Sequence, residues 1–425
     1  MVENANSGLF ERIRFRGRPR AHPDSVVVSG QARFTVLTRR LIRLEWSATG
    51  QFEDRATYAF PTRYAPAPEF AVEAADGMLR LDTGALRLHY VPDSGRFTPE
   101  NLSIRFQVGG QQRTWVPGRA NPLNLRGTRR TLDMCEADAA LDEGLVSRAG
   151  WTVFDDSQSV LFDPDDGWVV PPRDHEVQDW YFFGYGHDYK GALAEYMRFG
   201  GPIPLIPRYV LGAWWSRYWS YSAEELQELV REFEAHDVPL DVLVVDMDWH
   251  TPHGWTGYTW NRELFPDPPA FLQWVHDKGL RVALNLHPAE GVQVFEEVYP
   301  RFAEAMGVDP ESGEAIPFCI TDREFVEHYF ELLHHPMEDG GRGEGGGVDF
   351  WWVDWQQGEG CEMRGLDPLL WLNHLHFADS ARRERRPMPK AAWRRSTCGC
   401  RKGRGSSTPP KRPSPGRAGC GWWVT

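Results

Sequence analysis

The sequence predicts an antiparallel β-sandwich followed by the first half of a parallel (β/α)8 barrel, and three observations lead to this fold class. Short runs of alternating apolar and polar residues recur through residues 26–180, which is typical of antiparallel strands with one buried face. From residue 208 onward, apolar runs alternate with amphipathic segments, which indicates parallel strands connected by helices. The apolar runs end in acidic, aromatic or histidine residues, and the active sites of such barrels lie at this carboxyl end of the strands.

The sandwich pattern is clearest in four runs that are separated by Gly, Asp and Pro turn residues. Their apolar members are Phe34 and Val36; Ile42, Leu44 and Trp46; Leu86, Leu88 and Tyr90; and Leu102, Ile104, Phe106 and Val108. A helix over 188–198 and a Pro-rich hinge over 201–207 follow. We therefore expect four regions: an N-terminal extension (1–25), the sandwich (26–200), an incomplete barrel (201–380) and a basic tail (381–425).

The barrel region contains only four clear strands, expected at 209–214, 240–245, 280–286 and 348–353. Ser222 forms a capping box with Glu225 at the start of one helix, and Asp267 precedes the Pro that opens the next. Further helices are expected at 293–306, at 322–333 and after Asp367. An eight-stranded barrel needs roughly 250 residues, so the 172 residues from 208 to 379 predict half a barrel.

Charge is distributed unevenly along the chain. The formal net charge is −13, yet residues 381–425 carry 13 Lys and Arg and one acid, which leaves residues 1–380 at −25. Such an acidic body would repel nucleic acid and anionic membranes, so neither is an expected partner. No apolar run approaches the length of a membrane span and the first residues resemble no secretion signal. Cys135, Cys319 and Cys361 lack metal or disulfide spacing, so we expect free thiols in a reducing compartment. We therefore expect a cytoplasmic protein, and no cofactor is expected.

The tail changes composition abruptly. Residues 391–425 contain no Asp or Glu, show no periodicity and are rich in Arg, Gly, Pro and Ser, so we expect them to be disordered. One interpretation is a basic segment that binds nucleic acid or a partner. The preferred interpretation is a frameshift or a wrong gene end after about residue 386, and resequencing the locus tests it.

The acids at the strand ends suggest glycoside chemistry. Asp354 ends the most buried strand, between Trp352 and Trp355, whose rings can flank a sugar. An ionised carboxylate in an apolar setting is costly unless it is used or paired, so Asp354 is the candidate nucleophile of a retaining glycosidase. Asp246 suits a clamp on ligand hydroxyls, with His287 beside it. Alternatively, Asp246 and its neighbour Asp248 cap the loop that follows their strand.

Residues from about 30 to 380 resemble glycoside hydrolase family 31, the retaining α-glucosidase and α-xylosidase group. The matching stretches are LGAWWSRYW (211–219), DMDWH (246–250), GWTGYTWN (254–261), LNLHP (284–288) and FWWVDWQQG (350–358). The resemblance implies a galactose-mutarotase-like sandwich before the barrel, an oligosaccharide or glycoside substrate, the nucleophile at Asp354 and the substrate clamp at Asp246. His287 stands where many members have another Asp, and Trp215 or Trp214 matches the aromatic residue near the reacting sugar.

One departure from the family matters for activity. The family's acid/base Asp lies two strands beyond the nucleophile, where this sequence has the basic tail, so we assign no acid/base residue. Loss of the proton donor typically lowers the rate of such a reaction by a factor of about 10²–10⁴. In addition, a barrel that does not close exposes strand edges, which promote aggregation. We expect an enzyme design whose activity is impaired in this chain.

Two other functions remain open. A metal-dependent barrel hydrolase would use Asp246, Asp248, His250 and His253, or His374 and His376, since carboxylate and imidazole suit zinc or iron. Against it, the first barrel strand ends in Trp-Trp-Ser-Arg and has no His-x-His, so no metal is expected. A non-catalytic carbohydrate-binding protein is the second alternative. The oligomeric state and the choice between glucose and xylose are not predicted.

Overall fold

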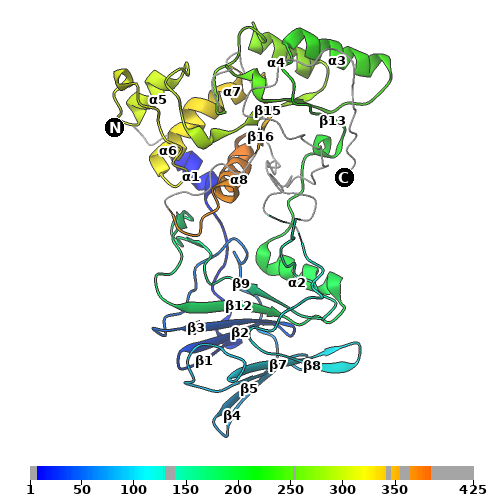
Figure 1. The fold of residues 1–425 in the computed structure, drawn as a ribbon, viewed down its shortest axis with the longest axis vertical. Helices are drawn as coiled ribbons and strands as arrows, with labels where there is room; N and C mark the ends of the chain where they lie inside the picture. The colour runs from blue at the N-terminus through cyan, green and yellow to red at the C-terminus, as the bar shows by residue number, and fades with distance from the viewer. Residues whose placement is uncertain are drawn as a thin grey trace.

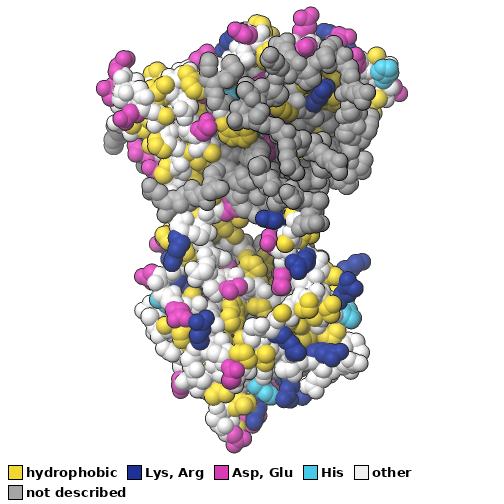
Figure 2. Space-filling view, in the orientation of Figure 1, with side chains coloured by type: hydrophobic (Ala, Val, Ile, Leu, Met, Phe, Trp, Pro, Cys, Tyr) yellow, Lys and Arg dark blue, Asp and Glu magenta, His cyan; other side chains and the backbone are white. Residues whose placement is uncertain are grey.

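The computed structural model describes residues 7–127, 129, 139–251, 255–340, 346–354 and 363–383. It has two lobes along its longest axis, one built from antiparallel sheets and one from a parallel sheet with helices (Figure 1). On the face drawn in Figure 2, basic and acidic side chains are interspersed over the described surface of the antiparallel lobe. No helix in the described ranges is long and apolar enough to cross a membrane.

The antiparallel lobe contains two five-stranded sheets with the orders β1-β2-β3-β12-β9 and β4-β5-β6-β7-β8. Phe34 and Leu44 of the first sheet and Leu88 and Ile104 of the second are fully buried in one shared core, as the period-two pattern predicts. A small hairpin, β10-β11, lies outside both sheets. The strands are β1 Val26–Ser29, β2 Ala32–Thr38, β3 Leu41–Ser47, β4 Ala71–Ala75, β5 Met78–Asp82, β6 Arg87–Tyr90, β7 Leu102–Val108, β8 Gln111–Trp115, β9 Thr152–Asp155, β10 Leu161–Phe162, β11 Val169–Val170 and β12 Val177–Phe183.

A buried ionic network covers the other face of the first sheet. Arg43 donates hydrogen bonds to both carboxylate oxygens of Asp179 at 2.8 and 2.7 Å, and Arg173 donates to the same residue. Although burial opposes ionisation, the charge of Arg43 holds the pKa of Asp179 well below its usual range. Asp156 is fully buried and accepts a bond from Thr57. Burial, with the nearby charge of Asp179, raises the pKa of Asp156 to about 6.

Among the described residues, the second lobe contains a four-stranded parallel sheet with the order β13-β14-β15-β16, in the region where four barrel strands were predicted. The predicted caps are present: Ser222 and Glu225 form a reciprocal capping box, and Asp267 accepts a bond from Ala270 N. The strands are β13 Trp214–Trp215, β14 Val242–Val245, β15 Arg281–Leu286 and β16 Phe350–Val353. Helix α2, Tyr189–Gly200, packs on the first antiparallel sheet. The helices of the second lobe are α3 Ala223–Ala235, α4 Pro268–Asp277, α5 Tyr299–Ala305, α6 Arg323–His328, α7 His335–Asp339 and α8 Pro368–Asp379.

The prediction of a strand over residues 209–214 is wrong for all of these residues except Trp214. Residues Arg208–Leu211 form a 3₁₀ turn, and β13 begins only at Trp214. The partner strand β14 limits the length of β13, because β14 begins at Val242, which pairs with Trp214. Immediately before this pair, the backbone N–H groups of Asp241 and Val242 both donate to Ala213 O.

Two predicted helices also differ in the structure. The helix expected from 293 begins at Tyr299, because Glu296 accepts bonds from Tyr258 N and Thr259 Oγ1, which hold this segment in a loop. The helix expected over 322–333 changes from α6 to a π-helical segment, Tyr329–His334, before α7. Pro336 has no N–H to donate to the carbonyl four residues earlier, which favours this wider turn.

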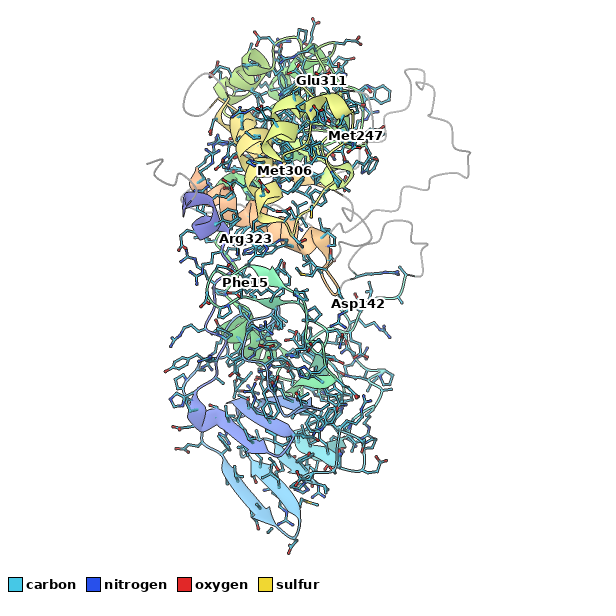
Figure 3. All side chains as sticks on the ribbon, turned by 90° about the vertical axis from the view of Figure 1, so that its left-hand side faces the viewer. Phe15, Asp142, Met247, Met306, Glu311 and Arg323 are labelled. Atoms are coloured by element: carbon cyan, nitrogen blue, oxygen red, sulfur yellow. The ribbon has the colours of Figure 1, made fainter. Side chains whose placement is uncertain are left out.

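The N-terminal segment belongs spatially to the parallel lobe. Helix α1, Ser7–Ile13, packs beside α8 (Figure 1), and Arg12 pairs with the buried Asp379 at 3.1 Å. Phe15 lies between the lobes (Figure 3), stacked on Phe162 with ring centroids 3.7 Å apart and 5.3 Å from the His374 ring. The region predicted as an extension therefore ties the sandwich to the half-barrel.

Candidate active site at the carboxyl ends of the parallel strands

The parallel sheet has two distinct faces. Its outer face carries Leu243, Val245, Leu284 and Trp351, which pack in one core with residues of α3–α6 and α8. Its inner face carries a separate, smaller cluster that contains Val242, Val244, Ala283 and Phe350, with Trp214 and Trp352 packed against it. Since side chains alternate along a strand, the residues that follow Val245, Leu286 and Val353 lie on the inner face. These are Asp246, His287 and Asp354.

Asp354 lies at the tip of β16, close to two polar side chains of the neighbouring strand. Its carboxylate is 14 % exposed, and its Oδ2 is 3.9 Å from His287 Nε2. Asn285 Nδ2 donates to the same oxygen at 3.4 Å. The backbone N–H of Asp354 donates to Leu286 O, which extends the β15–β16 pairing up to the acid. A carboxylate held this way is shielded from bulk water on one side and still reachable by a ligand.

Asp246 lies at the end of β14 on the same inner face and is half-buried. Its carboxylate accepts a bond from Met247 N at 2.8 Å, and Asp248 accepts one from Ser220 Oγ at 2.7 Å. Both acids therefore accept hydrogen bonds from local backbone or loop groups, as the alternative interpretation predicts. Burial and the charges of Asp248 and Asp246 raise the pKa of Tyr218, whose loop follows β13.

The predicted tryptophans separate onto opposite faces. The Trp214 ring lies against Phe350 and Trp352 on the inner face, with centroid distances of 5.3 and 6.4 Å. Trp215 packs against Phe233 of α3 on the outer face. The substrate contact predicted for Trp215 does not fit this placement, because the sheet separates its indole from Asp354. Trp352 shares the inner face with Asp354, as expected, and Trp355 lies outside the described residues.

Two residues, one beside Asp354 and one beside His287, were not singled out as site residues from the sequence. Asn285 is the single polar residue between Val282 and Leu286 of β15, and it lies two positions before His287, on the same face of the strand. That pattern could have identified it. Trp255 lies with its ring centroid 4.1 Å from that of His287. Its loop is anchored to the end of β15, since Trp255 N and Thr256 N both donate to Glu290 Oε2 and Thr256 Oγ1 donates to His287 O.

The histidines considered as metal ligands have structural contacts instead. Burial lowers the pKa of His250, whose Nδ1 lies 2.9 Å from Thr251 O. On α8, His374 Nε2 lies 2.7 Å from Ile13 O and His376 Nε2 lies 2.9 Å from Tyr329 OH. His253 is outside the described residues. Among the described ranges, no group of three or more His, Cys, Asp or Glu residues is arranged to hold a metal ion.

Comparison with known proteins supports a glycosidase relationship. The family model for the TIM-barrel domain of glycosyl hydrolases family 31 matches residues 203–379. An alpha-xylosidase of Saccharolobus solfataricus is 23 % identical over 274 residues, which are 61 % of this chain and 33 % of that protein. Alpha-xylosidase XylQ of Lactiplantibacillus pentosus is 31 % identical over 161 residues, which are 36 % of this chain and 21 % of that protein. The matches thus span a third or less of these relatives.

A solved structure shows the same fold at low sequence identity. The family 31 dextranase of Flavobacterium johnsoniae, complexed with glucose, aligns with a TM-score of 0.54 at 15 % identity, covering 78 % of this chain and 46 % of that one. Antiparallel sheets followed by a parallel barrel sheet are therefore an architecture that this chain shares with it. The family match over residues 203–379 identifies this part of the chain as a TIM-barrel region of glycoside hydrolase family 31, and the relatives named above are similar to the chain at lower coverage.

Proposed function

We propose that this chain carries the nucleophile side of a retaining α-glycosidase site for α-glucosides or α-xylosides, with Asp354 as the nucleophile. The observation that carries the proposal is the placement of Asp354 at the tip of β16, facing the same side of the sheet as Asp246, His287 and Trp352. The relatives named as alpha-xylosidases support the substrate class.

In the proposed reaction, one Asp354 oxygen attacks the anomeric carbon of the sugar. The bond from that carbon to the leaving oxygen breaks, and the electron pair goes to the leaving group. Asp246 accepts hydrogen bonds from sugar hydroxyls, and Trp352 provides an apolar face for the ring. His287 lies 3.9 Å from the Asp354 carboxylate, where it can contact the same sugar.

The second carboxyl group of such a mechanism, which protonates the leaving oxygen, is assigned to no residue of this chain. Alkyl glycosides depend on this proton, because an alkoxide is a poor leaving group, and general acid catalysis contributes about 10²–10⁴ in rate. A glycosyl fluoride does not, since fluoride leaves without being protonated. We therefore propose that the chain forms the glycosyl ester from activated donors and turns over ordinary α-glycosides slowly.

The test uses 5-fluoro-α-D-glucosyl and 5-fluoro-α-D-xylosyl fluorides, whose ring fluorine slows breakdown of the ester. Intact-protein mass spectrometry of the full chain should show one added glycosyl group, and peptide mapping should place it on Asp354. Asp354→Asn is the matched variant, because an amide of the same shape cannot attack, and it should remain unlabelled. Preference for one donor would identify the sugar accepted at the reacting position.

Two results would contradict the proposal. Labelling at a residue other than Asp354 would assign the nucleophile elsewhere. Absence of labelling, combined with calorimetric binding of maltose that survives Asp354→Asn, would favour a carbohydrate-binding protein without turnover.

A further inference from the structure

Asn285 is a buried amide in a layer where packing alone favours an apolar residue. It is 3 % exposed, and its register neighbour on β16 is Trp352. One layer below on the inner face are Val244, Ala283 and Phe350, all apolar. Burying an amide without full hydrogen bonding costs free energy, on the order of 1–3 kcal/mol for each unsatisfied group, so the presence of this side chain calls for a reason beyond packing.

The two ends of the Asn285 amide have different surroundings. Nδ2 donates to Asp354 Oδ2 at 3.4 Å. Oδ1 is buried and has no hydrogen-bond partner in the described part of the structure. The carboxylate fixes this orientation, because an amide oxygen facing Asp354 would meet another acceptor. Beside the proposed nucleophile there is thus a buried acceptor for which the described residues supply no donor.

The backbone of Asn285 is also held firmly. Its carbonyl accepts a bond from the indole Nε1 of Trp249 at 2.8 Å, and Trp249 is fully buried against Trp351 and Trp260. The loop after β14 and the strand β15 are therefore fixed to each other at this residue. A side chain on such a rigid point can define the orientation of its neighbours.

We propose that Asn285 is a positioning and ligand-binding residue of the Asp354 site. Its Nδ2 orients the Asp354 carboxylate for attack, and its Oδ1 accepts a hydrogen bond from a hydroxyl group of the sugar bound at the reacting position. This inference rests on the proposed function of Asp354.

The experiment measures the rate and concentration dependence of labelling by the 5-fluoroglycosyl fluoride that labels the unsubstituted protein. Asn285→Leu removes both hydrogen bonds at similar volume and should slow labelling about 10- to 100-fold, with a weaker apparent affinity. Its melting temperature should stay equal or rise, because an unsatisfied amide is replaced by an apolar group. Asn373→Leu, the same change at a half-buried site on α8, is the control and should label normally.

A second variant separates orientation from simple packing. Asn285→Asp keeps the shape and places an acceptor against Asp354, so labelling at pH 7.5 should fall below that of Asn285→Leu. On acidification toward pH 5 it should partly recover, because two adjacent carboxyl groups share a proton that restores the donor. Among the described residues, the other titratable groups around this site are His287, Asp246, Asp248 and Tyr218. They are common to every variant, so the pH profile of the unsubstituted protein provides the baseline for their effect.

The outcomes distinguish this inference from the proposed function. If the unsubstituted protein is not labelled at Asp354, the proposed function fails first. If it is labelled and Asn285→Leu reacts at the same rate, or if Asn285→Asp shows no recovery at low pH, the role of Asn285 is refuted. A loss of labelling in Asn285→Leu that follows a matching loss of folded protein would make Asn285 structural and would equally overturn the proposal.

Discussion

Strand β16 is flanked by two acids, and we predict opposite consequences when each is replaced. Asp349 precedes the strand and is 4 % exposed. It accepts hydrogen bonds from Val282 N and Arg281, and its Oδ2 lies 2.8 Å from His276 Nε2 of α4. The carboxylate thus fastens β15 and α4 to the start of β16. Asp354, at the other end of the strand, has a side chain that is 14 % exposed and is proposed to react.

The magnitude of the Asp349→Ala effect follows from these contacts. The Val282 N–H is buried, and leaving it unsatisfied costs about 1–3 kcal/mol. The His276 contact adds roughly 1.5–3 kcal/mol as a bond to a charged group, whereas Arg281 is 46 % exposed and its ion pair contributes little. The free energy of unfolding should therefore fall by about 3–5 kcal/mol, which corresponds to roughly 10 °C in the melting temperature of a lobe of this size.

The assay is thermal and urea unfolding followed by circular dichroism, with Asp349→Asn and Asp354→Asn as comparisons. Asp349→Asn keeps an acceptor for Val282 N and should lose only about 1–2 kcal/mol. Asp354→Asn should leave the melting temperature unchanged or raised, because functional groups are often placed at a cost in stability. An Asp349→Ala protein that melts like the unsubstituted chain, or an Asp354→Asn protein that melts much lower, would refute this division of roles.

Two further predictions concern the buried ionic network of the sandwich. Arg43→Met should lower the free energy of unfolding by about 3–5 kcal/mol in urea titrations, since it leaves the buried Asp179 without its bidentate partner; a loss below 1 kcal/mol would contradict this. Because the pKa of Asp156 is raised to about 6 in the folded state, its contribution to stability is present at low pH and is lost as the pH rises from about 4 through 6. Asp156→Asn should flatten the stability curve across that window and raise stability above pH 6. An unchanged curve would show that another group dominates.

Much of this architecture can be read from the chain because it depends on local periodicity. The alternation at Phe34, Leu44, Leu88 and Ile104 predicts which side chains meet in the sandwich core. The capping residue Ser222 predicts the start of α3 with its reciprocal hydrogen bonds. These features require only the strand and helix repeats and the chemistry of a helix end.

The candidate site divides between what is local and what is not. Alternation along β16 places Asp354 on the same face as Trp352, and this needs no knowledge of the neighbouring strands. The choice between Trp214 and Trp215 could not be made in that way, because β13 has only two residues and its pairing with Val242 and Leu243 decides which indole faces inward. Asn285 likewise gains its importance only from the register that brings it next to β16.

The sequence by itself determined the order of the elements, the acidic strand ends and the family resemblance, since each is written in short stretches of neighbouring residues. Only the tertiary structure decided that α1 packs on α8 in the parallel lobe, that Glu296 holds the segment before α5 in a loop, and that Asn285 joins Asp354. Each of these features depends on contacts between residues far apart in the chain. A local sequence pattern does not show which distant residues lie close together in space.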